Sequence, residues 1–168
     1  AKLWNQQGIR TITQKLIQTG NSGISEDIEQ HRQIMQMGWF PEDDSRLTMP
    51  EIFSYPASPH LAAKIDGRAV DFAKIAQATQ QLAERYDAVL LEGAGGLMVP
   101  LTDSLLSIDY AAEKNFPVIL VSSGRLGSIN HTILSLEALK SRGLQLHALA
   151  YNLSAESQDA LISKDTAE

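Results

Sequence analysis

A short apolar run that ends at an acid and a group of glycines constrains the fold of this chain most strongly. Residues 88–91 are all apolar, and Glu92, Gly93, Gly95 and Gly96 follow them. The run predicts a strand of a parallel sheet covered on both faces. Glycines allow backbone and ligand to come close, and an acid at the carboxyl end of a strand is typical of a metal–phosphate site. The same pattern also suits a tight strand-to-loop turn whose acid has no chemical role.

The composition excludes several classes of protein. The chain has 168 residues, of which 43% are hydrophobic, and its net charge is −6 with no basic block. Nucleic acid and anionic membranes are therefore not expected partners. The absence of cysteine excludes disulfides, thiolate catalysis and cysteine-based zinc sites. Without a signal peptide or an apolar run near the ~20 residues of a membrane span, a cytoplasmic location is expected.

Strands and helices are predicted to alternate along the chain. A helix ends near Gly8, and the region between residues 40 and 59, rich in proline, is predicted to be mostly irregular. Alternation implies one α/β domain over residues 1–168, with an open, mostly parallel sheet and helices on both faces. The predicted strands are 9–17, 88–92, 117–121 and 146–151, and the predicted helices are 26–37, 59–65, 71–86, 104–114 and 127–142.

Candidate ligand-binding residues lie where these strands end, as expected for open α/β sheets. Lys15 could contact phosphate or a carboxylate, or it could simply extend to solvent. Asp27 could bind Mg²⁺ together with Glu92, or it could only complement the dipole of its helix. Free amides at the helix start over residues 127–130 could hold an anion.

The remaining candidates are weaker. Asn152 follows a strand and could contact a base or merely begin a loop, and Asn130 could orient a polar ligand. His131 is interpreted as structural. The phosphate-binding pattern Gly-x-x-x-x-Gly-Lys-[Ser/Thr] does not occur in the sequence. No zinc site is predicted, because metal-ligand spacing is lacking at His31, His60 and His147.

Five segments in the same order resemble the dethiobiotin synthetase family. Glu92-Gly93-Ala94-Gly95-Gly96 matches the family's Glu-Gly-Ala-Gly-Gly, and the likeness covers nearly the whole chain. At Leu16 the chain departs from the family, which has proline there. The other four segments are Lys15–Gly20, the acidic pair Glu26-Asp27, Pro56–His60, and Arg125–His131.

The resemblance implies a fold like that of P-loop NTPases, a homodimer, and an enzyme that uses 7,8-diaminononanoate, CO₂ and MgATP. It implies that Lys15 is catalytic and that Asp27 and Glu92 hold Mg²⁺. It further implies substrate contacts for Thr19, Gly127, Ser128 and Asn130, and nucleotide contacts for Asp27, Glu92, Gly93, Ala94, Gly95 and Asn152.

Two alternatives stay open. The chain could be a non-catalytic or regulatory domain of the same fold, or another ATP-dependent synthetase of the superfamily. The family's first strand and P-loop would precede Ala1, and its C-terminal part would follow Glu168. We therefore expect the sequence to be incomplete at both ends.

Overall fold

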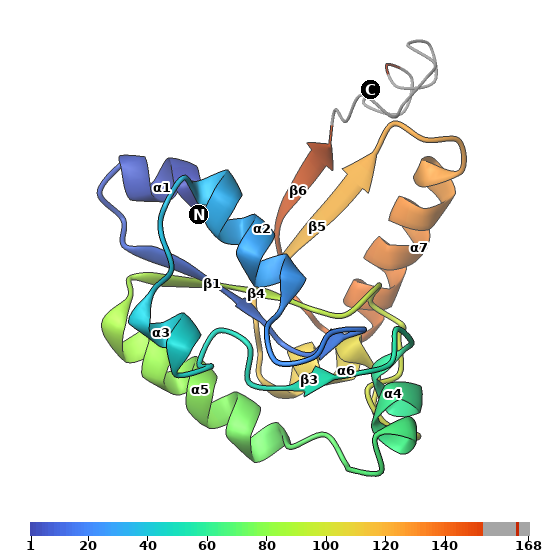
Figure 1. The fold of residues 1–168 in the computed structure, drawn as a ribbon. Helices are drawn as coiled ribbons and strands as arrows, with labels where there is room; N and C mark the ends of the chain where they lie inside the picture. The colour runs from blue at the N-terminus through green and yellow to red at the C-terminus, as the bar shows by residue number, and fades with distance from the viewer. Residues whose placement is uncertain (153–163, 165–168) are drawn as a thin grey trace. The chain divides into compact units, whose positions relative to one another are not determined.

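The computed structural model describes residues 1–152 and 164, and the chain divides into two compact units (Figure 1). Unit 1 comprises residues 1–107 and unit 2 comprises residues 108–168. Each unit is described by itself. The expected single domain over residues 1–168 stays a prediction.

The observed elements follow the predicted alternation closely. Within the described residues, no helix combines the length and the apolar character that crossing a membrane requires. The elements that lie in unit 1 are α1 (Lys2–Gln6), β1 (Thr11–Lys15), β2 (Gln18–Thr19), α2 (Glu26–Met35), α3 (Pro41–Asp44), β3 (Ile52–Phe53), α4 (Pro59–Ile65), α5 (Phe72–Arg85) and β4 (Ala88–Glu92). Helix α6 (Ser107–Glu113) begins at the boundary, and β5 (Val118–Ser123), α7 (Ser128–Ser141) and β6 (Leu146–Asn152) follow in unit 2.

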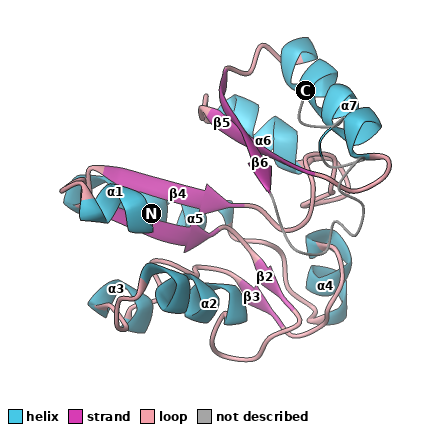
Figure 2. Ribbon diagram, turned by 90° about the horizontal axis from the view of Figure 1, so that it is seen from above, coloured by secondary structure: helices cyan, strands magenta, loops and turns pink. Residues whose placement is uncertain are grey.

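All three strand pairs of the described structure are parallel (Figure 2). Strand β1 pairs with β4, β2 with β3, and β5 with β6. The chain runs from β1 directly into β2, and its backbone there has partners on both sides. Leu16 N donates to the carbonyl of Glu92 at 2.8 Å, while Lys15 N donates to the carbonyl of Thr48 at 2.8 Å. The predicted α/β class with parallel strands is confirmed.

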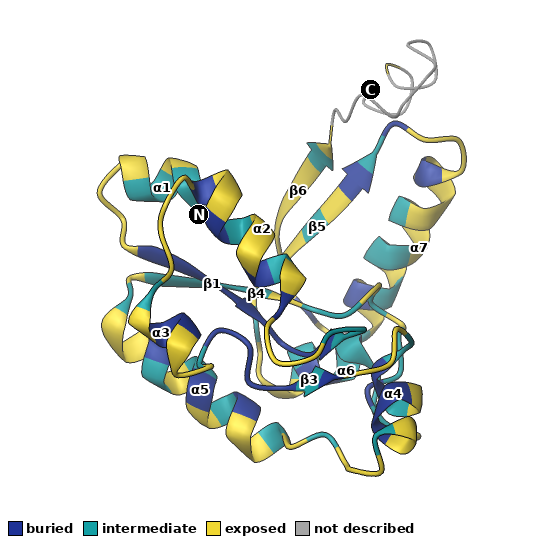
Figure 3. Ribbon diagram, viewed as in Figure 1, coloured by how far each residue is buried: buried dark blue, intermediate teal, exposed yellow. Residues whose placement is uncertain are grey.

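Local sequence signals explain where the helices begin and which side they bury. The Ser25 hydroxyl accepts from Ile28 N at 3.2 Å and so caps the start of α2. Helix α5 buries Ile75, Ala78 and Leu82, and the opposite face is exposed (Figure 3).

Strand β1 is completely buried although its sequence, Thr-Ile-Thr-Gln-Lys, is mostly polar. Its side chains are tolerated inside because each polar group is paired. Gln14, for example, donates to the carbonyl of Leu47 at 2.8 Å and accepts from the Thr79 hydroxyl at 2.8 Å. By contrast, residues 88–91 of β4, which were predicted to be covered on both faces, are only half-buried.

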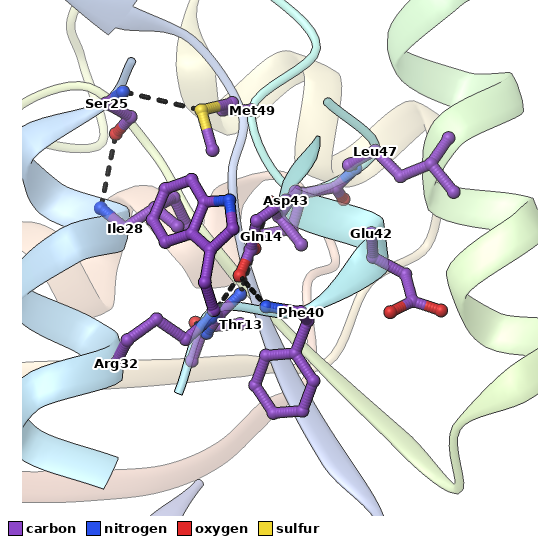
Figure 4. Close-up of polar contacts among 12 residues, drawn as sticks. Thr13, Gln14, Ser25, Ile28, Arg32, Phe40, Glu42, Asp43, Leu47 and Met49 are labelled. Carbon is purple, nitrogen blue, oxygen red and sulfur yellow. Dashed lines mark hydrogen bonds and ion pairs between the residues drawn. The ribbon is translucent and has the colours of Figure 1, made fainter. Parts of the chain in front are cut away.

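A buried ion pair joins α2 to α3 (Figure 4). Arg32 donates to the two oxygens of Asp43 at 2.8 and 2.6 Å, and to the Thr13 hydroxyl at 2.8 Å. Thr48 and the backbone N of Phe40 complete the shell around the carboxylate. Burial opposes ionisation of Asp43, but these hydrogen bonds outweigh it and lower the pKa of the carboxyl group.

The expectation of a mostly irregular segment between residues 40 and 59 is confirmed, but the segment contains two short elements that were not predicted. Pro41 opens α3, because the first helical position needs no N–H donor and proline already has the helical φ angle. Residues 52–53 form β3, a short strand that pairs with β2. Here the prolines mark element boundaries instead of preventing regular structure.

Replacing Asp43 by Ala is expected to cost about 3–5 kcal/mol of unfolding free energy, because it leaves the Arg32 guanidinium buried without a counter-ion. Urea denaturation followed by circular dichroism measures this loss. The matched control is Asp103→Ala, which breaks the solvent-exposed pair with Lys64 and should shift the midpoint far less. Equal shifts for the two variants would contradict the assigned role of the buried pair.

Candidate functional site

The carboxyl ends of β1 and β4 bring one lysine and two acids into direct contact. The parallel register pairs Lys15 with Glu92, so their side chains lie on the same face. The Lys15 ammonium lies 2.8 Å from Glu92 Oε1 and 2.6 Å from Asp27 Oδ2, and it donates to the carbonyl of Gly93 at 3.0 Å. The lysine side chain is only 7% exposed, whereas the side chains of Asp27 and Glu92 are 32% and 48% exposed. Three residues predicted from separate segments therefore meet at one nitrogen atom.

Backbone hydrogen bonds fix the chain at Lys15 and Leu16, one to Thr48 and one to Glu92. The hydrogen bond from Leu16 N to Glu92 O continues the β1–β4 pairing one residue beyond Lys15. Proline, which the resemblance leads one to expect at this position, has no N–H and could not donate. The departure at Leu16 thus adds a backbone bond next to the Lys15–Glu92 pair.

A histidine completes the group. His31 Nε2 lies 2.8 Å from Glu92 Oε2, and His31 follows Asp27 by one helical turn of α2. The hydrogen bond from His31 lowers the pKa of Glu92 by more than burial raises it. The hydrogen bond and the positive charge of Lys15 lower it further. Together they lower the pKa of Glu92 from 4.5 to about 2, so the carboxylate is ionised at neutral pH.

A cavity of about 330 Å³ in unit 1 opens beside this group. Five predicted site residues line it, and its other walls come from Ile17, Gln18, Val99 and the segment that begins α4. The lining includes Lys15, Thr19, Asp27, Ser58, Ala94 and Gly95. The cavity is therefore bounded by the lysine, by one of its two acids, by a hydroxyl-bearing residue of β2 and by the glycine-rich loop after β4.

Two glycines at or next to this cavity lie too close to neighbouring residues to carry a side chain. At Gly95 the φ angle is +75°, and an added Cβ would lie 2.9 Å from Val99 Cγ2. At Gly20 the φ angle is +80°, and a Cβ would lie 2.9 Å from the Cβ of Pro56. Side chains at these two positions would strain the backbone and push the wall segments apart.

The other four predicted site residues lie in unit 2. Gly127 precedes α7 with a φ angle of +89°. Ser128 is buried, with its hydroxyl 3.1 Å from that of Ser122, and Asn130 is exposed. A cavity of about 390 Å³ in this unit is lined by Ser128 and Asn152 among others. Unit 2 thus brings together Ser128 and Asn152 at one cavity, and Gly127 and Asn130 at the start of the adjoining helix.

Comparison with known proteins identifies the family. A family model described as "AAA domain" matches residues 8–166. The ATP-dependent dethiobiotin synthetase BioD 2 of Pasteurella multocida is 51% identical over 166 residues, which cover 99% of this chain and 78% of that protein. BioD of Chlorobaculum tepidum is 49% identical over all of this chain and 70% of its own. BioD 2 of Haemophilus influenzae is 48% identical over 99% and 87%. This chain belongs to the dethiobiotin synthetase family.

Membership in the dethiobiotin synthetase family confirms the resemblance read from the sequence and, with the AAA-domain match, the predicted fold class. The ligands of the individual site residues stay predictions. His31 was missed, because the histidines were assessed only for metal-ligand spacing. Its position four residues after Asp27, on the same helical face, was the available signal.

The chemistry of the acids fits a magnesium ion. Asp27 and Glu92 supply hard carboxylate oxygens that reach the same nitrogen atom. In the part of the chain that the structure describes, no three or more His, Asp or Glu residues converge as a complete metal site. Two carboxylates are nevertheless the usual protein contribution to Mg²⁺, whose other ligands are waters and phosphate oxygens.

The lowered pKa of Glu92 predicts a pH-dependent contribution to stability. Its folded-state pKa lies below the ordinary value of 4.5, so this contribution is fully present above that pH. It is lost as the pH falls from 4.5 towards 2. A pH titration followed by ¹³C NMR of the side-chain carboxyl carbon should give a midpoint near pH 2 for Glu92. A midpoint near 4.5, or a Glu92→Gln variant with the same acid sensitivity as the parent, would contradict the assignment.

Proposed function

We propose that this chain is an ATP-dependent dethiobiotin synthetase. The substrates are 7,8-diaminononanoate, CO₂ and ATP. One amine of the diamine captures CO₂ as a carbamate. The carbamate oxygen then attacks the γ-phosphorus of ATP, which releases ADP and leaves the carbamate activated as a mixed anhydride. The second amine then closes the cyclic urea and releases phosphate.

The single observation that carries this proposal is the contact of Lys15 with Asp27 and Glu92 at the edge of a cavity. A buried ammonium group next to a cavity stabilises negative charge that develops during phosphoryl transfer. Lys15 therefore binds the carbamate oxygen and the γ-phosphate and holds them in position. Its placement inside the protein makes this charge more effective than the charge of a surface lysine.

The other residues of unit 1 bind the reactants around Lys15. The hydroxyl group of Thr19 contacts the diamine substrate. The small residues Ala94 and Gly95 allow the nucleotide to approach the backbone, and Gly93 and Glu92 border it on the same loop. A separate assignment, taken from the family resemblance alone, gives the side-chain amide of Asn152 in unit 2 the adenine as its ligand.

Asp27 and Glu92 would hold Mg²⁺ together with the nucleotide. The charge that such an ion supplies would offset the negative charge of the nucleotide phosphates. Both carboxylates now contact Lys15, so binding of the nucleotide exchanges their partner and releases the ammonium group for the reacting oxygens.

The start of α7 binds the distant carboxylate of the substrate. Ser128 N already donates to the carbonyl of Arg125 at 3.0 Å, so the groups that suit an anion are the other backbone N–H groups of this helix start and the side chain of Asn130. The family resemblance suggests a homodimer, with this carboxylate bound across the subunit interface.

Replacing Lys15 by Gln in the full-length protein should lower kcat about 10²–10³-fold, because the transition state loses a fixed positive charge. Mass spectrometry of dethiobiotin formed in the presence of ATP and bicarbonate measures the effect. The control, Lys64→Gln, changes an exposed lysine on α4 and should keep the parental rate. If Lys15→Gln turned over normally, Lys15 would not be catalytic. If the parent formed no dethiobiotin, the non-catalytic alternative would hold.

Replacing Asn130 by Ala should raise KM for 7,8-diaminononanoate about tenfold, because a hydrogen bond to a charged group is lost. KM for ATP should change little. Steady-state kinetics with each substrate varied separately measure the two constants. Glu137→Gln, an exposed position on the same helix, is the control. Equal changes in both KM values would argue against a carboxylate contact at Asn130.

A further inference from the structure

His31 contacts Glu92 but has no role in the proposed reaction. Its ring is 18% exposed, and Nε2 lies 2.8 Å from Glu92 Oε2. Nδ1 is buried and has no hydrogen-bond partner among the described residues. An ionised carboxylate only accepts hydrogen bonds, so Nε2 carries the proton and donates it. The contact to Glu92 is therefore the polar interaction that orients this ring.

Glu92 needs such a contact to keep one orientation. It is the last residue of β4, its side chain is 48% exposed, and Gly93 follows it. Lys15 holds Oε1 at 2.8 Å, which alone would allow the carboxylate to rotate about its own axis. His31 holds Oε2, so each oxygen has a donor and the carboxylate plane is fixed.

The same helix also fixes the second acid. Asp27 and His31 are four residues apart on α2 and face the same way. The helix itself is held by the Ser25 cap and by the buried pair of Arg32 with Asp43. Helix α2 therefore sets the position of Asp27 directly and that of Glu92 through His31.

We propose that His31 is a positioning residue that aligns Glu92 with Asp27 for binding of the divalent cation–nucleotide complex. The inference rests on the proposed function, since it takes these two acids as the cation ligands. Loss of a hydrogen-bond partner of a metal-ligating group typically costs 10–100-fold in metal affinity or activity. Any role of His31 in the reaction is thus indirect, through Glu92.

The test measures binding of Mn²⁺ together with AMPPNP, a non-hydrolysable ATP analogue, to the full-length protein by electron paramagnetic resonance. His31→Ala should weaken binding about 10–100-fold. His31→Gln keeps an N–H donor on a side chain of similar reach, and it should restore most of the affinity. Gln33→Ala changes an exposed residue of the same helix and should bind like the parent.

Kinetics add a second readout. His31→Ala should raise KM for MgATP much more than KM for the diamine, whereas a general loss of folded protein would lower the apparent kcat and leave both KM values unchanged. Parental affinity in His31→Ala would overturn the inference. So would a His31→Gln variant as weak as His31→Ala, since the donated hydrogen bond would then be irrelevant. If the parent itself did not bind Mn²⁺–AMPPNP or form dethiobiotin, the proposed function would fail and this inference with it.

Discussion

The polar side chains of β1 require partners, and the rest of unit 1 supplies them. A buried polar group left without a hydrogen bond costs about 1–3 kcal/mol, and an unpaired charge costs more. Thr13 is paired by Arg32 of α2, and Gln14 by Thr79 of α5. Lys15 is paired by acids from α2 and β4. A strand with this sequence can be buried only if these surrounding elements are correctly placed, so the same contacts specify the fold and build the site.

Helix α2 shows how the two tasks are divided. Ile28, Arg32 and Met35 face the interior and attach the helix to the protein. Asp27 and His31 lie on an adjacent side and reach Lys15 and Glu92. Because the attachment uses a buried and fully hydrogen-bonded ion pair, the position of the helix is well defined. The geometry of the candidate site therefore depends on a pair of residues that takes no part in the chemistry.

The sequence predicts part of this arrangement and misses part of it for physical reasons. Glu92 and the following glycines, the Ser25 cap and the limits of α4 could be predicted, because each depends on neighbouring residues. The burial of β1 could not, since its polar side chains are neutralised by partners distant in the sequence. The contact between His31 and Glu92 could not be predicted for the same reason, because these two residues are also distant in the sequence. The short elements between residues 40 and 59 were missed because proline was taken only as a breaker of structure.

The Lys15 ammonium has two counter-ions from its own chain before any reactant arrives. An incoming phosphate does not meet an isolated positive charge, as it would at a surface lysine. It replaces existing ion pairs, and the two released carboxylates need a new cation at the same time. If Asp27 and Glu92 are the metal ligands, as the proposed function has it, phosphate and metal are therefore expected to bind together. A phosphate group without its metal would displace these ion pairs and leave both acids without a cation, so the pocket would favour metal-complexed nucleotide.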